Sequence, residues 1–300
     1  MKTDSLPPIM YWASTDLALQ KAREGMDIRA INESGSIQNG ETLEEAHEQA
    51  VRDFWDIEQL INGAFQYLEE SGIFVSGNAI DMGSGTGVGA AILSKKSSLN
   101  QIYALEISEQ FVTQIMPKIF IKFNAEMSKI QRVVGDFNKI QLPDESIDLI
   151  FDLDSFHHSE DLNFTLKECF RILKPNGVIL MIDRGWDDRV SVNYLKMMLD
   201  KELNPKPKQK YNIPQDKKFT RRDWGEHEYR LLDWENYFTN NGFKLEIFSQ
   251  KHPPFLNSIL LKTPTFEWTI KRSSIQSRRG KNRHSIYGFN KNRRLMIAKK

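Results

Sequence analysis

The sequence contains one cysteine and no long apolar run. Because Cys169 is the single thiol, an intramolecular disulfide is excluded, and a reducing compartment fits best. A membrane-spanning helix needs about eighteen or more consecutive apolar residues, and the chain has no such stretch. The N-terminal stretch MKTDSLPPIMYW also lacks the apolar segment of a signal peptide. We therefore expect a cytoplasmic protein with no membrane span.

Acidic residues are absent after Glu267, whereas Lys and Arg remain frequent up to Lys300. The net charge of the whole chain is only +1, so the rest of the sequence is balanced in charge. We interpret residues 263–300 as a basic C-terminal tail. Such a tail is either a solvated segment or a binding segment for an anionic partner, a membrane surface or nucleic acid. The balance elsewhere favours the solvated segment.

The hydrophobic pattern divides the chain into three further zones. Residues 1–75 carry apolar side chains at helical spacing and predict an N-terminal helical cap. In residues 76–262, short apolar runs alternate with helical segments, which predicts an α/β domain with a parallel sheet covered on both faces. Residues 183–230 interrupt this rhythm and predict a lid or acceptor insertion. The segments 244–250 and 257–263 predict two final strands that can pair antiparallel.

The segment Ala79–Gly89 reads AIDMGSGTGVG and places glycines at every second position after an apolar strand. Glycine has no Cβ, so such a loop lets a ligand approach the backbone before the next helix begins. The segment Gly85–Ala90 also fits the dinucleotide fingerprint G-x-G-x-x-A. A tight strand-to-helix turn without a ligand is a third interpretation.

Acidic side chains end three of the predicted strands. Asp81 precedes the glycines, Glu106 ends the next strand about twenty residues later, and Asp136 ends a third strand. Because parallel strands direct their carboxyl ends to one edge of the sheet, these carboxylates are expected to meet at the ligand-binding edge.

Three segments resemble the class I S-adenosylmethionine-dependent methyltransferases. IDMGSGTG resembles the first motif of that family, commonly (L/V)DLGCGTG, with Ser84 in place of the usual cysteine or small residue. VVGDFNKIQLPDESIDLI and the segment that ends in LKPNGVILMID match later motifs in the same order, from Ala79 to Asp183. The broad type 11 small-molecule branch is the most similar. The resemblance implies a doubly wound, Rossmann-like, seven-stranded sheet that is mostly parallel and has an antiparallel last strand.

The resemblance also implies S-adenosyl-L-methionine as cofactor. Glu106 would bind the ribose hydroxyls, Asp136 the adenine amino group, and Asp81 would orient the amino end of the cofactor. An acidic lining suits this sulfonium cation and argues against a nicotinamide-dependent oxidoreductase. The cofactor-binding residues that the resemblance implies are Asp81, Gly83, Ser84, Gly85, Gly87, Glu106, Ile107, Asp136, Phe137 and Asp152.

Candidates for a catalytic proton acceptor follow the fourth strand, namely Asp154, His157 and His158. The two histidines are adjacent, so we expect at most one of them to face the cleft. A structural role through capping or packing is the alternative for either histidine. In the insertion, Arg222, His227 and Tyr229 are candidate contacts of the methyl acceptor. No pattern of metal-ligating residues is evident.

These features predict a methyltransferase that acts on oxygen or nitrogen, with carbon as a further option, of a small-molecule or glycan-type acceptor. One alternative is an RNA or protein methyltransferase that uses the basic tail. Against it, the N/D-P-P-Y/F signature of many such enzymes is absent after the fourth strand. A second alternative is a scaffold that binds the cofactor without catalysis. No sequence feature indicates an oligomeric state.

Overall fold

A computed structural model describes residues 6–14, 16, 43–210, 213–251, 267–271 and 293–300. In these residues a single sheet of nine strands has the order β1-β4-β3-β2-β5-β6-β9-β7-β8. The strands are β1 (Met10–Tyr11), β2 (Gly77–Met82), β3 (Leu99–Glu106), β4 (Ile130–Val134), β5 (Ile147–Leu153), β6 (Leu173–Arg184), β7 (Lys244–Lys251), β8 (Glu267–Lys271) and β9 (Arg293–Lys299). Strands β1 to β6 pair in parallel, and β9 runs antiparallel to both of its neighbours.

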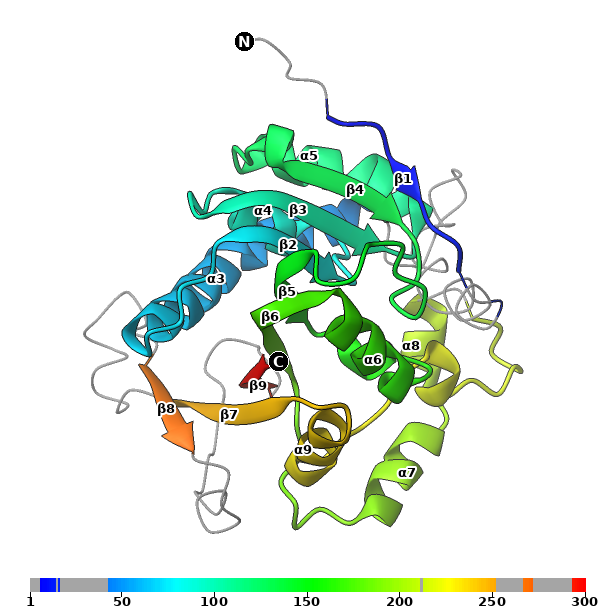
Figure 1. The fold of residues 1–300 in the computed structure, drawn as a ribbon. Coiled ribbons are helices and arrows are strands. Elements are labelled where there is room, and N and C mark those ends of the chain that lie inside the picture. The colour runs from blue at the N-terminus through cyan, green and yellow to red at the C-terminus, as the bar shows by residue number, and fades with distance from the viewer. Residues whose placement is uncertain (1–5, 15, 17–42, 211–212, 252–266, 272–292) are drawn as a thin grey trace, which may run out of the picture.

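Helices cover the two faces of this sheet (Figure 1). The helices are α3 (Leu43–Glu70), α4 (Val88–Ser94), α5 (Met116–Lys122), α6 (Leu162–Ile172), α7 (Val192–Asp200), α8 (Pro205–Lys210) and α9 (Leu231–Asn240). Alternate residues of a strand point to opposite faces. Ala79 therefore packs in the apolar cluster with α3, α4 and α5, whereas Ile80 packs in the cluster with α6 and α9. The predicted doubly wound α/β fold is confirmed.

The C-terminal strand differs from the sequence-based prediction. The charge pattern places residues Arg293–Lys299 in the basic tail, but they form β9 between β6 and β7. Leu295 to Ala298 are buried, because the short apolar run LMIA lies in a strand with a neighbour on each side, whereas Arg294, Lys299 and Lys300 beside it are half-buried. The expected antiparallel last strand is thus present, but residues 293–299 supply it. Residues 257–263 lie outside the described part of the chain, as do residues 272–292 of the tail.

Two short strands at the edges raise the number of strands from the expected seven to nine. β1 pairs with β4 at one edge, and β8 pairs with β7 at the other. None of the described helices combines the length and the apolar composition needed to cross a membrane.

The N-terminal cap is represented by α3, which packs along α4 and α5. Phe54 is fully buried, and its ring stacks on Phe123 with 3.5 Å between the ring centroids.

The insertion begins and ends beside the C-terminus of β6. The Trp186 N–H donates to the Tyr229 carbonyl at 2.9 Å, and the Leu231 N–H donates to the Trp186 carbonyl at 2.9 Å. These bonds fix the two ends of the insertion side by side. Helices α7 and α8 lie between them in the sequence.

If β9 belongs to the core, shortening one of its buried side chains should destabilise the whole domain. Leu295 is fully buried, so we expect Leu295→Ala to lower the free energy of unfolding by about 2–5 kcal/mol. Lys299→Ala on the same strand is the matched control, since its half-exposed ion pair with Glu246 should contribute at most about 1 kcal/mol. Urea unfolding measures both. Equal, small losses would place the C-terminal segment outside the core.

Candidate functional site

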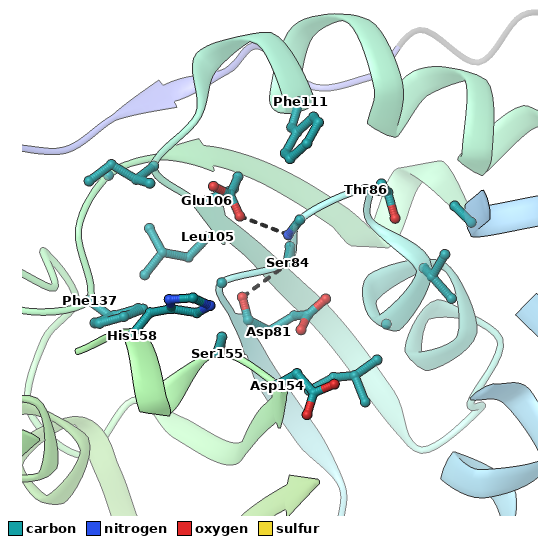
Figure 2. A pocket seen from close by; sticks show the side chains of 18 of the residues that line it. Asp81, Ser84, Thr86, Leu105, Glu106, Phe111, Phe137, Asp154, Ser155 and His158 are labelled. Carbon is teal, nitrogen blue, oxygen red and sulfur yellow. Dashed lines mark hydrogen bonds between the residues drawn. The ribbon is translucent and has the colours of Figure 1, made fainter. Parts of the chain in front are cut away.

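A cavity of about 350 Å³ lies at the carboxyl ends of β2, β3, β4 and β5 (Figure 2). This is within the size range of small-molecule sites in proteins. The loop after β2 and helix α3 both contribute residues to its lining. Its lining includes most of the residues that the resemblance implied for the cofactor, namely Asp81, Gly83, Ser84, Gly85, Glu106, Ile107, Asp136 and Phe137.

The glycines of this loop have different physical reasons to lack a side chain. Gly83, Gly85 and Gly87 all have positive φ angles, between 52° and 87°. A Cβ on Gly83 would lie 2.5 Å from the Cβ of Ser155, so the loop and the turn after β5 could not approach as they do. Gly87 does not line the cavity, and a Cβ there would lie 2.8 Å from Phe120. Gly87 therefore makes room for α5, whereas Gly83 and Gly85 border the cavity.

Glu106 and Asp136 use their carboxylates to hold the turns that follow their strands. The Gly85 N–H donates to Oε2 of Glu106 at 2.8 Å, and the Ser108 N–H donates to its Oε1 at 2.9 Å. The Asn138 N–H donates to Oδ1 of Asp136 at 2.8 Å. Both carboxylates are buried yet line the cavity, so they order the backbone around it and face its interior.

Asp81 is a buried carboxylate at the end of β2, beside the glycine loop (Figure 2). Burial raises its pKa to about 7, and nearby Glu106 adds to this effect, although hydrogen bonds to Ser84 and Ala90 oppose it. Its Oδ2 atom lies buried with no hydrogen-bond partner among the described residues. A buried acceptor of this kind is expected to receive a donor from a ligand.

The two acids after strand β5 occupy different places. Asp152 lies outside the cavity lining, and its Oδ1 accepts hydrogen bonds from the Phe156 N–H at 2.8 Å and the Ser155 N–H at 3.2 Å. Burial, together with the charge of Asp183, raises the pKa of Asp152. Asp154 lines the cavity and has φ of 55°, a conformation that aspartate tolerates better than most residues. Asp152 thus supports the turn on which Asp154 is presented.

The adjacent histidines also separate. His157 is buried outside the cavity lining, and its Nδ1 lies 2.7 Å from Oδ1 of Asp183. His158 lines the cavity, and its Nδ1 lies 3.1 Å from the Gly225 carbonyl. Burial, with the neighbouring ring of His157, lowers the pKa of His158 to about 3. His158 is therefore neutral at physiological pH and a weak base.

None of the three candidate acceptor contacts lines the cavity formed by the described residues. Arg222 pairs with Asp200, with 2.6 Å between Nε and Oδ1. The Nδ1 atom of His227 lies 3.0 Å from the His157 carbonyl. Tyr229 packs against Trp234, with 4.6 Å between the ring centroids. Their contact with an acceptor stays a prediction.

The residues of α3 that line the cavity are not among those singled out from the sequence. Gln49, Asp53 and Ile57 line it, and the Gln49 side chain donates to Oδ2 of Asp53 at 2.6 Å. Their spacing of four residues places them on one face of the helix, which is a signal that the sequence contained. The lining also includes residues that the sequence analysis does not name as candidates, namely Thr86, Phe111, Leu153, Ser155 and Glu160.

Comparison with known proteins agrees with this geometry. Residues 80–181 match the family model described as "Methyltransferase domain". The chain is 33% identical over 98 residues to the malonyl-[acyl-carrier protein] O-methyltransferase of Methylococcus capsulatus. The matched segment covers 33% of this chain and 34% of the relative. The chain is also 28% identical over 137 residues to the 2-methyl-6-phytyl-1,4-hydroquinone methyltransferase of Synechocystis. Here the matched segment covers 42% of this chain and 40% of the relative.

The chain carries a class I S-adenosylmethionine-dependent methyltransferase domain. The matched residues run from β2 to β6 and include the glycine loop, Glu106, Asp136 and Asp154. The two curated relatives are matched over well under half of their own length. Among solved structures, a putative S-adenosyl-L-methionine-dependent methyltransferase from Methanococcus maripaludis is similar, with TM-score 0.46, 24% identity, and coverage of 73% of this chain and 92% of that chain.

The cofactor of this methyltransferase domain is S-adenosylmethionine. The described residues fit this group on two observations. The buried Oδ2 of Asp81 is available to accept from the cofactor's cationic end, and no atom lies within 4 Å of the position where a Cβ on Gly85 would stand. The loop therefore leaves the backbone at Gly85 open to a ligand.

The raised pKa of Asp81 predicts a pH dependence of stability in the ligand-free protein. Because the folded state binds this proton more tightly than the unfolded state, the stabilisation is complete below about pH 4 and is lost as the pH rises through 7. The free energy of unfolding should fall by up to about 1.4 kcal/mol per pH unit in this interval. Denaturant unfolding between pH 5 and 8 measures it. Asp81→Asn should flatten the curve, and an unchanged slope would contradict the assignment.

Proposed function

We propose that this methyltransferase domain transfers the methyl group of S-adenosylmethionine to a nitrogen or oxygen of a small-molecule acceptor, with an amine as the favoured class. The acidity of the cavity is the observation that carries this proposal. Among the described lining residues there is no lysine or arginine. The lining carboxylates are Asp53, Asp81, Glu106, Asp136, Asp154 and Glu160.

Three of these acids fit the methyl donor. Glu106 would bind the ribose hydroxyls, because its carboxylate already points into the cavity beside the Gly85 backbone. Asp136 would accept from the adenine amino group, and Asp81 would hold the cationic end of the cofactor. The side chains of Ile107 and Phe137 would pack against the adenine ring from the lining of the cavity. When bound, the cofactor supplies a methyl carbon that is activated by a positively charged sulfur.

The remaining acids, Asp53, Asp154 and Glu160, favour an acceptor that is cationic or neutral over one that carries a carboxylate. Like charges in a partly enclosed site repel each other, so an anionic acceptor would bind at an electrostatic cost. An ammonium acceptor must lose a proton before its nitrogen lone pair attacks the methyl carbon. Asp154 is the candidate for receiving this proton, since it lines the cavity and the lowered pKa of His158 makes that imidazole a weak base.

Glu106 offers a test of cofactor binding. Glu106→Gln keeps one oxygen for the loop but removes the charge that would bind two ribose hydroxyls, so the affinity for S-adenosylmethionine should fall by about 10- to 100-fold. Glu109→Gln is the control, because Glu109 is exposed and does not line the cavity. Isothermal titration calorimetry measures both affinities. If the intact protein does not bind the cofactor, the proposed function is wrong.

A matched set of acceptors tests the acceptor class. Primary amines, alcohols and carboxylates of the same carbon skeletons are incubated with the protein and S-adenosylmethionine, and mass spectrometry records the gain of one methyl group. We expect amines to be methylated at least about tenfold faster than carboxylates, and Asp154→Asn to slow the reaction by about 100-fold or more. Preferred methylation of the carboxylates would contradict the amine assignment. Total RNA is incubated in parallel, and methylation of RNA alone would instead support an enzyme that acts on nucleic acid.

A further inference from the structure

We propose that His157, His158 and Glu226 form a binding site for a divalent transition-metal ion at the edge of the cavity. One ligating atom from each side chain lies within 4.8 Å of the other two. Two imidazole nitrogens and one carboxylate oxygen are a donor set that zinc and other first-row transition metals use in proteins. The sequence showed no metal pattern because Glu226 lies 68 residues after His158.

The hydrogen bonds of both imidazoles leave the Nε2 atom of each ring available to bind an ion. A carbonyl oxygen can only accept, so the Nδ1 of His158 carries the proton that it donates to the Gly225 carbonyl at 3.1 Å. His157 likewise donates from Nδ1 to the Asp183 carboxylate at 2.7 Å. Each ring therefore presents the lone pair of Nε2. A histidine ligand oriented by a carboxylate or a carbonyl is the usual second layer of a metal site.

The two segments that carry the ligands are fixed to each other by the backbone. The His157 carbonyl accepts from the His227 N–H at 3.1 Å and lies 3.0 Å from the Nδ1 of His227. Glu226 is the residue directly before His227, so its position relative to the histidines is set by these bonds. Nε2 of His157 and Oε2 of Glu226 are 3.8 Å apart. Metal bonds of about 2.0–2.2 Å require ligand atoms about 3.3 Å apart, which a small rotation of Glu226 would achieve.

Two arginines compete with a metal ion for Glu226. Arg184 binds its Oε2, and Nη2 of Arg221 lies 3.1 Å from the same atom. Arg221 also binds Glu228 at 2.6 Å, so it keeps a partner if an ion displaces it from Glu226. With Asp183, Glu226 and Glu228 against the two arginines, the local formal charge is negative by one unit, which favours a cation. Arg221 should nevertheless weaken the binding of the metal through repulsion.

The cluster lies at the edge of the cavity, so a bound ion could act on the methyl acceptor; this step rests on the proposed function. His158 and Gly225 line the same cavity as the donor-binding acids. An ion held by three protein ligands keeps an open position, as catalytic metal sites do. That position would bind an oxygen or nitrogen of the methyl acceptor and so orient it.

Metal titration of the full chain tests the site without any methyl donor or acceptor, so its outcome is separate from that of the proposed function. The protein is first treated with a chelator and then titrated with Zn²⁺ by calorimetry and with Co²⁺ by visible absorption. We expect one ion per chain, and His158→Gln and Glu226→Gln should each weaken binding by at least about tenfold. His47→Gln on α3 is the control, with an unchanged affinity expected.

Arg221→Gln provides a test that a loss of structure cannot imitate. Removing this positive charge should tighten metal binding by about tenfold. Circular dichroism spectra of all variants check that they are folded. The proposal is overturned if the intact chain binds no ion, if His158→Gln and Glu226→Gln bind as tightly as the intact chain, or if Arg221→Gln binds more weakly.

Discussion

The hydrogen bond from the Gly85 N–H to the Glu106 carboxylate is the contact on which the cavity depends. It joins the loop after β2 to the end of β3, so the backbone at Gly85 stays turned toward the cavity. The same carboxylate also accepts from Ser108 and thereby fixes the turn that follows β3. One buried side chain thus sets the shape of two loops and supplies part of the acidic lining.

The concentration of negative charge in this cavity works against the stability of the ligand-free protein. Carboxylates removed from water favour their neutral form, and burial raises the pKa of Asp81 for this reason. A cationic ligand would relieve the repulsion among Asp81, Glu106 and the other acids. Burial of charge, which is costly to the fold, is therefore the basis on which we propose a positively charged partner for this site.

The other end of the cavity is assembled around the end of β6. Asp183 orients His157, and the next residue, Arg184, binds Glu226 from the insertion. The turn after β5 and the insertion are thus joined through two consecutive residues of one strand. This arrangement explains why His158 and Gly225 border the same cavity although they are distant in the sequence.

The sequence by itself determined the glycine loop, the acids at the ends of β2, β3 and β4, and the alternation of strands and helices, because strand, turn and helix preferences are encoded in short segments. It could not show that residues 293–299 complete the sheet, since their pairing with β6 and β7 is made across long loops. It also could not decide which adjacent histidine faces the cavity, or that the face of α3 that carries Gln49 and Asp53 packs against this cavity. Those outcomes depend on packing between distant elements, and only the tertiary structure decided them.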